Sequence, residues 1–495
     1  MKKYCDGCIT GTKSIRGRIY MDNNLLKSFK PAGDHNPIMT QRFGADPFAM
    51  VYKDRVYMYM TCDILTYDEA GKLTENNYSK INTISVASSA DLVNWTDHGV
   101  VYAAGKDGIA TWGGNSWAPA ACWKNIDGKD KFFLYFANSG NGIAVLSSDS
   151  PTGPFVDPIN GPLVSRDTPN CASVTWLFDP AVLVDDDGTG WLYIGGGVPS
   201  DDKAANPGTA RVVRLTDDMI HLAEDPKPIE NVAYLFEDSG INKINGKYYY
   251  SYCSNFNVTP EATEKLGFES GEILTMVSDK PDGPFVPSAA VLKNPGFFFG
   301  RGGNNHHCMF EFKGKYYIAY HSRILEEYMG LDGGFRSTNV DEINLGADGA
   351  PAKSTGTRKG VAQVGSFDPY ACVPAATFAS MAGLKTVEYL EGTTDKKLFA
   401  GEMLVSPEEN GSWMSIEGVD FGTQGASSVT VTARSENGMG ICVFAGSEKV
   451  AEFKTAASAD FAEATFNLSS KVTGKQDIRF VFDGAKGEVR CWKFN

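Results

Sequence analysis

Short runs of alternating apolar and polar residues dominate the 495-residue chain. Five segments between residues 45 and 322 share one pattern: a polar or proline-marked opening, a short apolar run, a turn rich in Gly, Asp, Asn and Lys, and a second run rich in aromatic residues. A period of two interrupted by such a turn predicts a β-hairpin. The five segments are ADPFAMVYKDRVYMYMTCD from Ala45, WAPAACWKNIDGKDKFFLYFAN from Trp117, FDPAVLVDDDGTGWLYIGG from Phe178, FEDSGINKINGKYYYSYCS from Phe236 and NHHCMFEFKGKYYIAYHS from Asn305.

The hairpins recur about every 60 to 70 residues, a spacing typical of a propeller built from four-stranded blades. A weaker repeat follows the same order, because SDSPTGPFV at residues 148–156 recurs as SDKPDGPFV at residues 278–286. We therefore predict an all-β fold in which a five-bladed β-propeller occupies residues 1–345.

The character of the chain changes after residue 345. Residues 346–374 are rich in small and turn-forming residues, which indicates a closing strap and a linker. Residues 375–495 contain short alternating runs, among them SSVTVTARS, DIRFVFDG and VRCWKFN, without helical periodicity. This pattern predicts a second domain that is a β-sandwich of the jelly-roll kind.

The residues that open the five hairpins form a set. In a propeller the first strand of each blade lines the central channel, so these residues should meet at one face of it. Turn capping by an acidic residue explains any one of them alone, but recurrence at one place in the repeat favours a shared site. The opening positions are Asp46, Ala118, Asp179, Glu237 and His306.

Three carboxyl groups at one channel mouth can perform general acid and base catalysis. A glycosidic bond is cleaved by two carboxyl groups, of which one is protonated and the other ionised. A third carboxylate near the acid raises its pKa, because like charges disfavour ionisation. Asp46, Asp179 and Glu237 provide such a set, and we predict that Glu237 is the protonated acid while Asp238 points away.

The sequence around the second opening fits sugar binding. The stretch TWGGNSWAPAACW, residues 111–123, places Trp112 and Trp117 near Asn115. Aromatic rings can cover the apolar faces of a sugar, while amides bond its hydroxyl groups. Packing between blades is the alternative, more for Trp117 than for Trp112, which two glycines follow.

The net charge of −14 and the isoelectric point near 5.0 exclude a partner that carries many phosphates, since such binding needs clustered Lys and Arg. We expect neither a nucleic-acid nor a membrane partner, because an apolar run of about 18 residues is also missing. The first residues lack the apolar stretch of a signal peptide. We expect an intracellular protein or one whose leader has been removed.

Ten cysteines are scattered along the chain, and Cys5 with Cys8 forms the only CxxC. A structural zinc site would usually have a second such pair. This favours free, buried thiols in a reducing compartment. The sequence leaves open a disulfide between Cys442 and Cys491.

Six segments of residues 30–370 follow one another in a characteristic order: NPIMTQRFGADPFAMVYKDRVYMYMTCD, NSWAPA, FDPAVLVDDDGTGWLYIGGG, FEDSGI, NNHHCMF and GGFRSTNVDEI. Through this set the chain resembles glycoside hydrolase family 43, and within it the arabinoxylan arabinofuranohydrolase and β-xylosidase-like members. The resemblance implies hydrolysis with inversion of configuration, for which the two carboxyl groups stand roughly 6.5–9.5 Å apart to admit a water.

By position, the resemblance implies that Asp46 is the general base, Asp179 modulates the pKa and orients the acid, and Glu237 is the general acid. It implies no cofactor for the chemistry and a possible calcium ion in the channel near His306. Histidine is an unusual calcium ligand, so contact through water fits better; His307 is the alternative residue for this place. The substrate-binding set that we predict is Phe43, Trp112, Asn115, Phe178, His307 and Arg336.

Residues 375–495 are similar to carbohydrate-binding module family 6 in AGLKTVE, GSWMSIEGVDFGTQGASSVTVTARS and VRCWKFN. Three positions depart from that pattern. Ala376 replaces an early glutamate that helps to bind calcium, Cys491 replaces an aspartate before the last tryptophan, and Phe461 is the only aromatic residue in TAASADFAEATF apart from its last position. These departures favour a domain that packs against the propeller.

These observations favour an inverting, exo-acting glycosidase that removes α-L-arabinofuranosyl residues from plant cell-wall arabinoxylan or xylan fragments. A β-xylosidase is the second reading. A non-catalytic sugar-binding propeller is the alternative from another class, and the three retained acids argue against it. A retaining fructan- or sucrose-active relative would carry an RDP motif, which this chain lacks.

Overall fold

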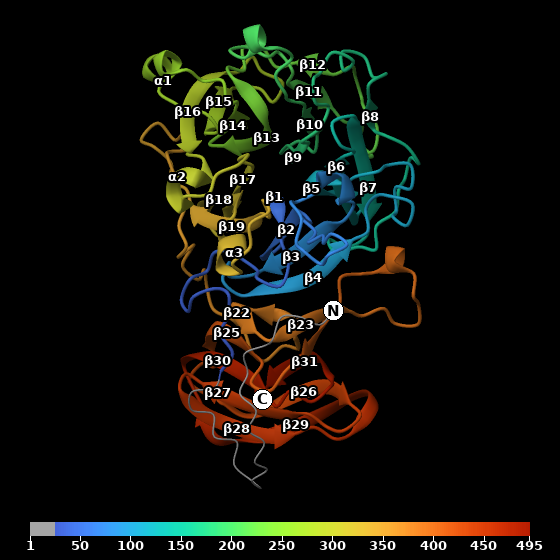
Figure 1. Cartoon of the computed structure of the whole chain (residues 1–495), viewed down its shortest axis with the longest axis vertical. Helices are drawn as coiled ribbons and strands as arrows, with labels where there is room; N and C mark the ends of the chain where they lie inside the picture. The colour runs from blue at the N-terminus through green and yellow to red at the C-terminus, as the bar shows by residue number, and fades with distance from the viewer. Residues whose placement is uncertain (1–24) are drawn as a thin grey trace.

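The computed structural model describes residues 25–495 and shows two β-rich parts, one above the other in Figure 1. The predicted CxxC of Cys5 and Cys8 lies outside the described residues. Helices are short: α1 (Pro260–Leu266), α2 (Pro295–Phe299), α3 (Ile324–Tyr328) and three 3₁₀ turns, η1 (Tyr78–Lys80), η2 (Asp201–Lys203) and η3 (Lys396–Leu398). None of the helices in this part of the chain is long and apolar enough to cross a membrane.

Five antiparallel sheets follow one another through the first part, as the hairpin repeat predicts. The first contains β1 (Ala45–Tyr52), β2 (Arg55–Thr61), β3 (Ile84–Ser89) and β4 (Trp95–Val101); the second β5 (Trp117–Ile126), β6 (Lys129–Ala137), β7 (Gly142–Ser148) and β8 (Val164–Ser165); the third β9 (Ala181–Val184), β10 (Gly190–Ile194), β11 (Arg211–Arg214) and β12 (Lys227–Pro228); the fourth β13 (Leu235–Ile244), β14 (Lys247–Ser254), β15 (Ile273–Ser278) and β16 (Val286–Leu292); and the fifth β17 (His307–Phe312), β18 (Lys315–Ser322) and β19 (Ser337–Glu342).

The first strands of these sheets pack against one another in a closed sequence: β1 on β5, β5 on β9, β9 on β13, β13 on β17, and β17 on β1. The hairpin turns have the residues that their geometry requires. Between β13 and β14, Asn245 and Gly246 have φ of 51° and 77°, the left-handed pair that a tight hairpin needs. Apolar side chains fill the spaces between neighbouring sheets, so the polar residues at the inner strand ends are left to face a common centre.

The second part consists of a five-stranded and a six-stranded sheet that face each other, with Trp492, Phe480 and Phe421 in the core between them. This is the predicted β-sandwich. One sheet has the order β22 (Ser380–Ala382), β25 (Trp413–Asp420), β30 (Lys475–Phe482), β27 (Gly440–Ala445) and β28 (Glu448–Lys454). The other has β23 (Leu384–Glu388), β24 (Met403–Pro407), β31 (Glu488–Phe494), β26 (Ala426–Ser435) and β29 (Ser458–Val472), with β20 (Val373–Pro374) on β31.

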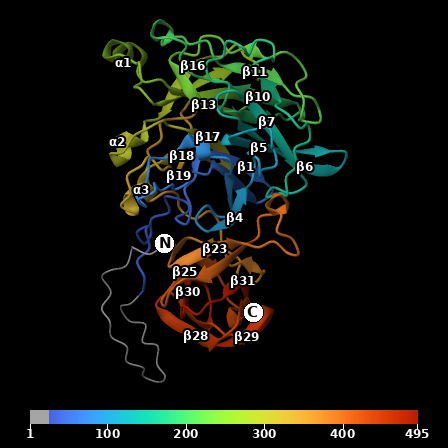
Figure 2. The same ribbon diagram turned by 45° about the vertical axis from the view of Figure 1, so that its right-hand side comes forward.

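The two parts share a strand. β21 (Thr377–Phe378) pairs with β4, so the chain entering the second part adds a fifth strand to the first sheet. Figure 2 shows the close approach of the two parts near β4. The Asn94 side chain also bonds the backbone of Glu417, donating to its carbonyl at 2.8 Å and accepting its N–H at 2.9 Å. The sandwich is therefore attached to the first sheet by backbone pairing as well as by side chains.

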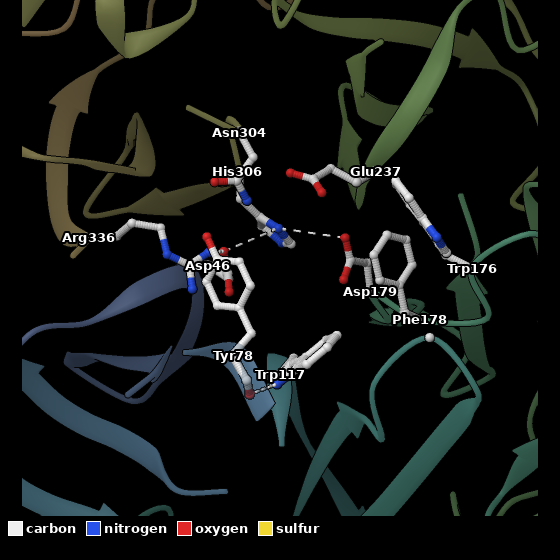
Figure 3. A pocket seen from close by; sticks show the side chains of 11 residues that line it. Asp46, Tyr78, Trp117, Trp176, Phe178, Asp179, Glu237, Asn304, His306 and Arg336 are labelled. Carbon is white, nitrogen blue, oxygen red and sulfur yellow. Dashed lines mark hydrogen bonds and ion pairs between the residues drawn. The ribbon is translucent and has the colours of Figure 1, made fainter. Parts of the chain in front are cut away.

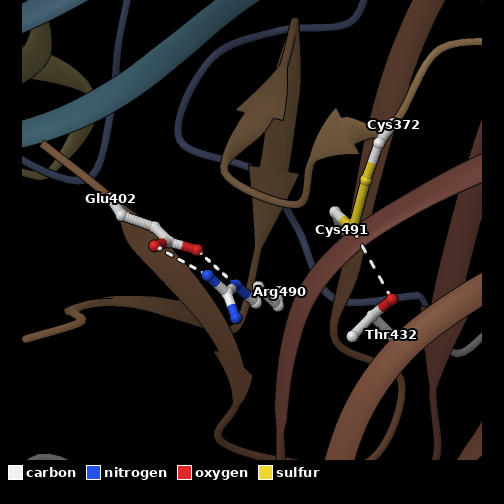
Figure 4. Close-up of a disulfide and its surroundings, with 5 residues drawn as sticks. All are labelled: Cys372, Glu402, Thr432, Arg490 and Cys491. Carbon is white, nitrogen blue, oxygen red and sulfur yellow. Dashed lines mark hydrogen bonds and ion pairs between the residues drawn. A yellow bond between two sulfur atoms is a disulfide. The ribbon is translucent and has the colours of Figure 1, made fainter. Parts of the chain in front are cut away.

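A disulfide joins Cys372, in the segment before β20, to Cys491 in β31 (Figure 4). The pairing that the sequence left open, Cys442 with Cys491, is wrong, because Cys442 is a free, buried thiol in β27 on the opposite sheet. The prediction that all cysteines are free thiols is wrong as well, because Cys372 and Cys491 form a disulfide. The other described free cysteines are all buried: Cys62, Cys122, Cys171, Cys253 and Cys308.

Candidate active site

A cavity of about 420 Å³ opens where the inner strands meet (Figure 3). Carboxyl groups from three different sheets face it, and aromatic rings form much of its wall. Its lining residues are Asp46, Tyr78, Trp117, Gly140, Trp176, Phe178, Asp179, Glu237, Asn304, His306 and Arg336. The repeat thus brings together side chains that are up to 290 positions apart in the sequence, as Arg336 and Asp46 show.

The backbone marks equivalent positions in four of the sheets. Asp46, Ala118, Asp179 and Asp238 all have φ in the left-handed region, at 47°, 42°, 47° and 74°. Such values are uncommon for residues other than glycine and are concentrated at functional sites. By this criterion the fourth member of the set is Asp238, so the predicted opening residue Glu237 lies one position before it.

Hydrogen bonds join neighbouring sheets at three of these positions and at His307 in the fifth sheet. In each case a backbone N–H of an inner strand donates to a side chain of the preceding sheet, which fixes that side chain near the centre. The four bonds run from Asp46 to Nδ1 of His321 (3.1 Å), from Ala118 to Oγ1 of Thr61 (2.8 Å), from Asp238 to Oδ2 of Asp179 (3.0 Å), and from His307 to Oδ1 of Asp238 (3.1 Å).

Asp46 is held as a carboxylate. Nη1 of Arg336 donates to its Oδ1 at 2.9 Å, and the same guanidinium makes two bonds to Asp63, at 2.8 and 3.0 Å. Burial would raise the pKa of Asp46, but Arg336, with His321 and His306, outweighs burial and holds that pKa well below its usual range. Asp46 is therefore ionised and able to accept a proton from water.

Asp179 and Glu237 have the opposite electrostatic environment. Burial first, then the neighbouring carboxyl groups, raise the pKa of both well above the ordinary value. Oδ2 of Asp179 accepts the N–H of Asp238, which stabilises a charge there. Oε1 of Glu237 is buried and has no hydrogen-bond partner within residues 25–495, which disfavours a charge. The proton that the pair retains therefore belongs on Glu237.

His306 lies between the carboxyl groups. Its Nδ1 is 3.7 Å from Asp46 and 3.8 Å from Asp179, and its Nε2 is 3.1 Å from Oδ1 of Asp238. Across residues 25–495, no group of three or more His, Cys, Asp and Glu side chains has an arrangement that could hold a metal ion. These contacts do not fit His306 as a direct metal ligand, because the carboxylates around it already bind Arg336, the backbone and histidine.

Asp238 and His307 lie behind the cavity rather than in its wall. Asp238 is fully buried; its Oδ1 accepts the N–H of His307, and its Oδ2 shares a hydrogen bond with Nδ1 of His307. The other ring nitrogen of His307 bonds Oγ of Ser251 at 2.9 Å. Asp238 thus points away from the cavity, as predicted, but it is bound tightly within the centre of the fold.

Residues 35–351 match the family described as glycosyl hydrolases family 43, and residues 374–495 match carbohydrate binding module family 6. The chain belongs to glycosyl hydrolase family 43. The resemblance seen in the sequence is confirmed, and with it an all-β, propeller-type fold followed by a β-sandwich. The molecule is a glycosidase of this family.

The relatives of this family 43 chain include two named arabinoxylan arabinofuranohydrolase. That of Paenibacillus polymyxa is 43% identical over 94% of this chain and 75% of the relative, and that of Bacillus subtilis is 42% identical over 88% of this chain and 87% of the relative. This chain is also similar to a solved structure, the crystal structure of a family 43 arabinoxylan arabinofuranohydrolase from Bacillus subtilis in complex with cellotetraose. The two structures superpose with a TM-score of 0.89 and are 41% identical in sequence, over 94% of this chain and 99% of that chain.

The family 43 structure places the predicted site residues in two groups. Asp46, Asp179, Glu237, Phe178, His306 and Arg336 line the cavity. The other four do not line it, and their role as substrate contacts stays a prediction. Phe43 packs on Phe335, Nε1 of Trp112 bonds Asp157, Asn115 bonds the backbone of Tyr78 and Ile81, and His307 is buried behind the cavity.

Several lining residues were missed or left undecided from sequence. Tyr78, Gly140, Trp176 and Asn304 were not predicted, and Trp117 was considered equally a packing residue. Tyr78 and Trp176 lie in connecting segments, where the hairpin repeat carries no information. The repeat could have suggested Asn304 only as a neighbour of the fifth opening.

The departures of the carbohydrate-binding module occur at contacts within the protein. Ala376 is fully buried, and its carbonyl accepts the N–H of Asp97 from the first sheet. Phe461 lies in β29, where its ring meets Tyr389 at 5.6 Å and lies below the guanidinium of Arg434 at 4.6 Å. One face of the Phe461 ring is therefore covered by an arginine.

Proposed function

We propose that this protein removes α-L-arabinofuranosyl residues from arabinoxylan-derived saccharides by inverting, general acid and base catalysis. The observation that carries the proposal is the division of protonation states in one aromatic-walled cavity. Arg336 holds Asp46 ionised, whereas burial and Asp179 hold Glu237 protonated. The two relatives above 40% identity are named for action on the same polymer.

In the proposed reaction Glu237 gives its proton to the departing glycosidic oxygen. Asp46 takes a proton from a water, which attacks the anomeric carbon from the opposite face, so that the sugar leaves with inverted configuration. Asp179 keeps the pKa of Glu237 high and is itself oriented by the N–H of Asp238. Phe178 and Trp176 form apolar walls for the sugar ring.

We also propose the finer structural divisions: the five sheets are the blades of a propeller predicted over residues 1–345, of which residues 1–24 lie outside the described part, residues 346–374 are the strap, and residues 375–495 are a jelly-roll. The chemistry needs no cofactor. A calcium ion reached through water from His306 stays a prediction, which metal analysis of the purified protein before and after chelation would test.

The test is release of L-arabinose from arabinoxylan by the wild type, Asp46→Asn and Glu237→Gln. Each variant should lose at least about 100-fold in kcat/KM, because each removes one proton-transfer partner. Glu230→Gln is the matched control, since Glu230 is exposed and outside the cavity. Unchanged activity in either site variant would contradict the assignment. A β-xylosidase is the second candidate, because the family relatives include an enzyme named xylosidase/arabinosidase. Rates on a panel of aryl arabinofuranosides and aryl xylosides distinguish the two activities.

A further inference from the structure

A second, smaller cavity of about 110 Å³ adjoins the active-site cavity. Tyr78, Asn304 and Arg336 line both. Two further arginines in the smaller cavity are neutralised: Nη1 of Arg301 is 3.6 Å from Glu326, and Arg323 bonds Glu326 and Asp332. The smaller cavity therefore suits a neutral, hydroxyl-bearing group rather than an anion.

Tyr78 is fixed at this junction through its backbone. Its carbonyl accepts bonds from Nδ2 of Asn115 at 3.2 Å and from Nε1 of Trp117 at 3.0 Å. Asn115 is held in turn by Oγ of Ser139 at 2.7 Å. Two residues before Tyr78, the N–H of Asn76 donates to the carbonyl of Gly333 at 2.7 Å. The segment is thus attached both to the second sheet and to the segment before β19.

The ring of Tyr78 lies over the guanidinium of Arg336, 4.9 Å from its centre, and Figure 3 shows it beside Asp46. Yet the residue is 45% exposed, so it is not part of a packed core. A half-exposed aromatic residue whose backbone is anchored from two sides and whose ring rests on an arginine has little freedom left to lose on binding a ligand. Rings of this kind are suited to form walls of binding sites.

We propose that Tyr78 is a specificity-determining residue. Its side chain contacts the arabinofuranosyl unit that the enzyme removes, and it separates this unit from the smaller cavity. This inference rests on the proposed function. Its ring limits the glycosyl unit to the size of a pentose, because a longer exocyclic chain on that side would meet the ring. With the ring removed, the two cavities join, and the extra hydroxyl-bearing carbon of a hexofuranosyl unit gains a neutral space.

The experiment compares 4-nitrophenyl α-L-arabinofuranoside with 4-nitrophenyl β-D-galactofuranoside. Both sugars have a five-membered ring, but the exocyclic chain of the galactofuranoside is one carbon longer. Loss of one aromatic contact in Tyr78→Ala should raise KM for the arabinofuranoside by about three- to tenfold with a smaller change in kcat. The ratio of kcat/KM for the galactofuranoside to that for the arabinofuranoside should rise by about the same factor. Tyr78→Phe keeps the ring and should leave both values within about twofold of wild type.

Tyr67→Ala is the matched control, because Tyr67 is a 56% exposed tyrosine of the same loop and lies outside both cavities. An equal fall for both substrates in Tyr78→Ala, or the same loss in Tyr78→Phe, overturns the proposal. The proposal is also overturned if Tyr78→Ala shifts the acidic limb of the kcat/KM profile without changing KM. The ring would then act only by covering the guanidinium of Arg336, not by contacting the sugar. If the wild type cleaves neither furanoside but cleaves an aryl xyloside, the proposed function fails separately, and the role of Tyr78 is judged with the xyloside.

Discussion

Nη1 of Arg336 lies 2.9 Å from Oδ1 of Asp46, and this ion pair joins the last sheet of the ring to the first. The same arginine binds Asp63, so one cation faces two buried carboxylates. Because the cation favours the ionised form of Asp46, the pair that closes the ring of sheets also keeps the proposed base ionised. The closure of the fold and the proposed chemistry therefore depend on the same contact.

Removing this cation should narrow the pH range of activity. The base must be ionised, and the folded enzyme holds the pKa of Asp46 well below its usual range, so wild-type kcat/KM should stay high far into the acidic range. In Arg336→Met the pKa of Asp46 should rise, and the acidic limb of the kcat/KM profile should move to higher pH. The measurement is kcat/KM for an aryl arabinofuranoside across the acidic range.

Arg336→Met also leaves Asp63 without its partner, so its folding must be checked by thermal unfolding. The double variant Asp63→Asn/Arg336→Met removes that unpaired charge and should show the same pH shift. Arg358→Met is the control, since Arg358 pairs with Glu327 at the surface, outside the cavity. An unmoved acidic limb in a folded Arg336 variant would show that another group sets the ionisation of Asp46.

Asp238→Asn should reduce stability more than it reduces the rate. Oδ1 of Asp238 accepts the N–H of His307 and faces Nε2 of His306, while Oδ2 bonds Nδ1 of His307, so an amide cannot reproduce the whole set of contacts. The expected loss is about 1–3 kcal/mol in the free energy of unfolding, measured by denaturant titration. The loss in kcat/KM should be smaller than that of Glu237→Gln. A larger rate loss in Asp238→Asn would reverse the assignment of the acid.

The hairpin repeat was sufficient to predict that Asp46, Asp179 and Glu237 converge, because equivalent positions of a repeated unit must lie around one centre. It did not predict the detail at the fourth sheet. There the left-handed position is Asp238, and Glu237 reaches the cavity from the residue before it. The alternation pattern has no signal for such a shift, since bulges change which residue faces inward.

The walls of the cavity were harder to predict than its acids. Trp112 is predicted to bind sugar because two glycines follow it; its indole bonds Asp157, and it does not line the cavity. Tyr78 gave no signal, because its place depends on Asn115 and Trp117, which bond its carbonyl from another sheet. Residues in connecting loops are positioned by such tertiary contacts, and neither spacing nor composition encodes them.

Reduction of the Cys372–Cys491 disulfide should destabilise the sandwich and leave the active site intact. The bond closes a loop with a sequence separation of 119 residues, and a cross-link of that size is worth about 3–5 kcal/mol through the unfolded state. Cys372→Ser should lower the unfolding temperature of the C-terminal part, and reducing agent should lower that of the wild type equally. Cys442 is a free, buried thiol, so the control variant Cys442→Ser should still show the fall in unfolding temperature when reducing agent is added. Loss of arabinofuranosidase activity at 25 °C on reduction would contradict the separation of the two parts.

The leaving group should decide how much Glu237→Gln costs. The general acid matters most when the departing oxygen is strongly basic, as in a saccharide, and least when it is a nitrophenolate that leaves without a proton. We therefore expect a loss of about 100- to 10,000-fold on arabinoxylan oligosaccharides and a much smaller one on a dinitrophenyl arabinofuranoside. The basic limb of the pH profile should also disappear, because Glu237, with its raised pKa, is the group whose deprotonation causes it.

Product stereochemistry, followed by proton NMR in the first minutes of the wild-type reaction, tests the partner role of Asp46. An inverted first product requires Asp46 to act on water, whereas a retained product would make it a nucleophile. Asp46→Asn should remain inactive with both leaving groups, since even a good leaving group still needs an activated water. Equal losses for the two leaving groups in Glu237→Gln would show that Glu237 positions the sugar rather than delivering the proton.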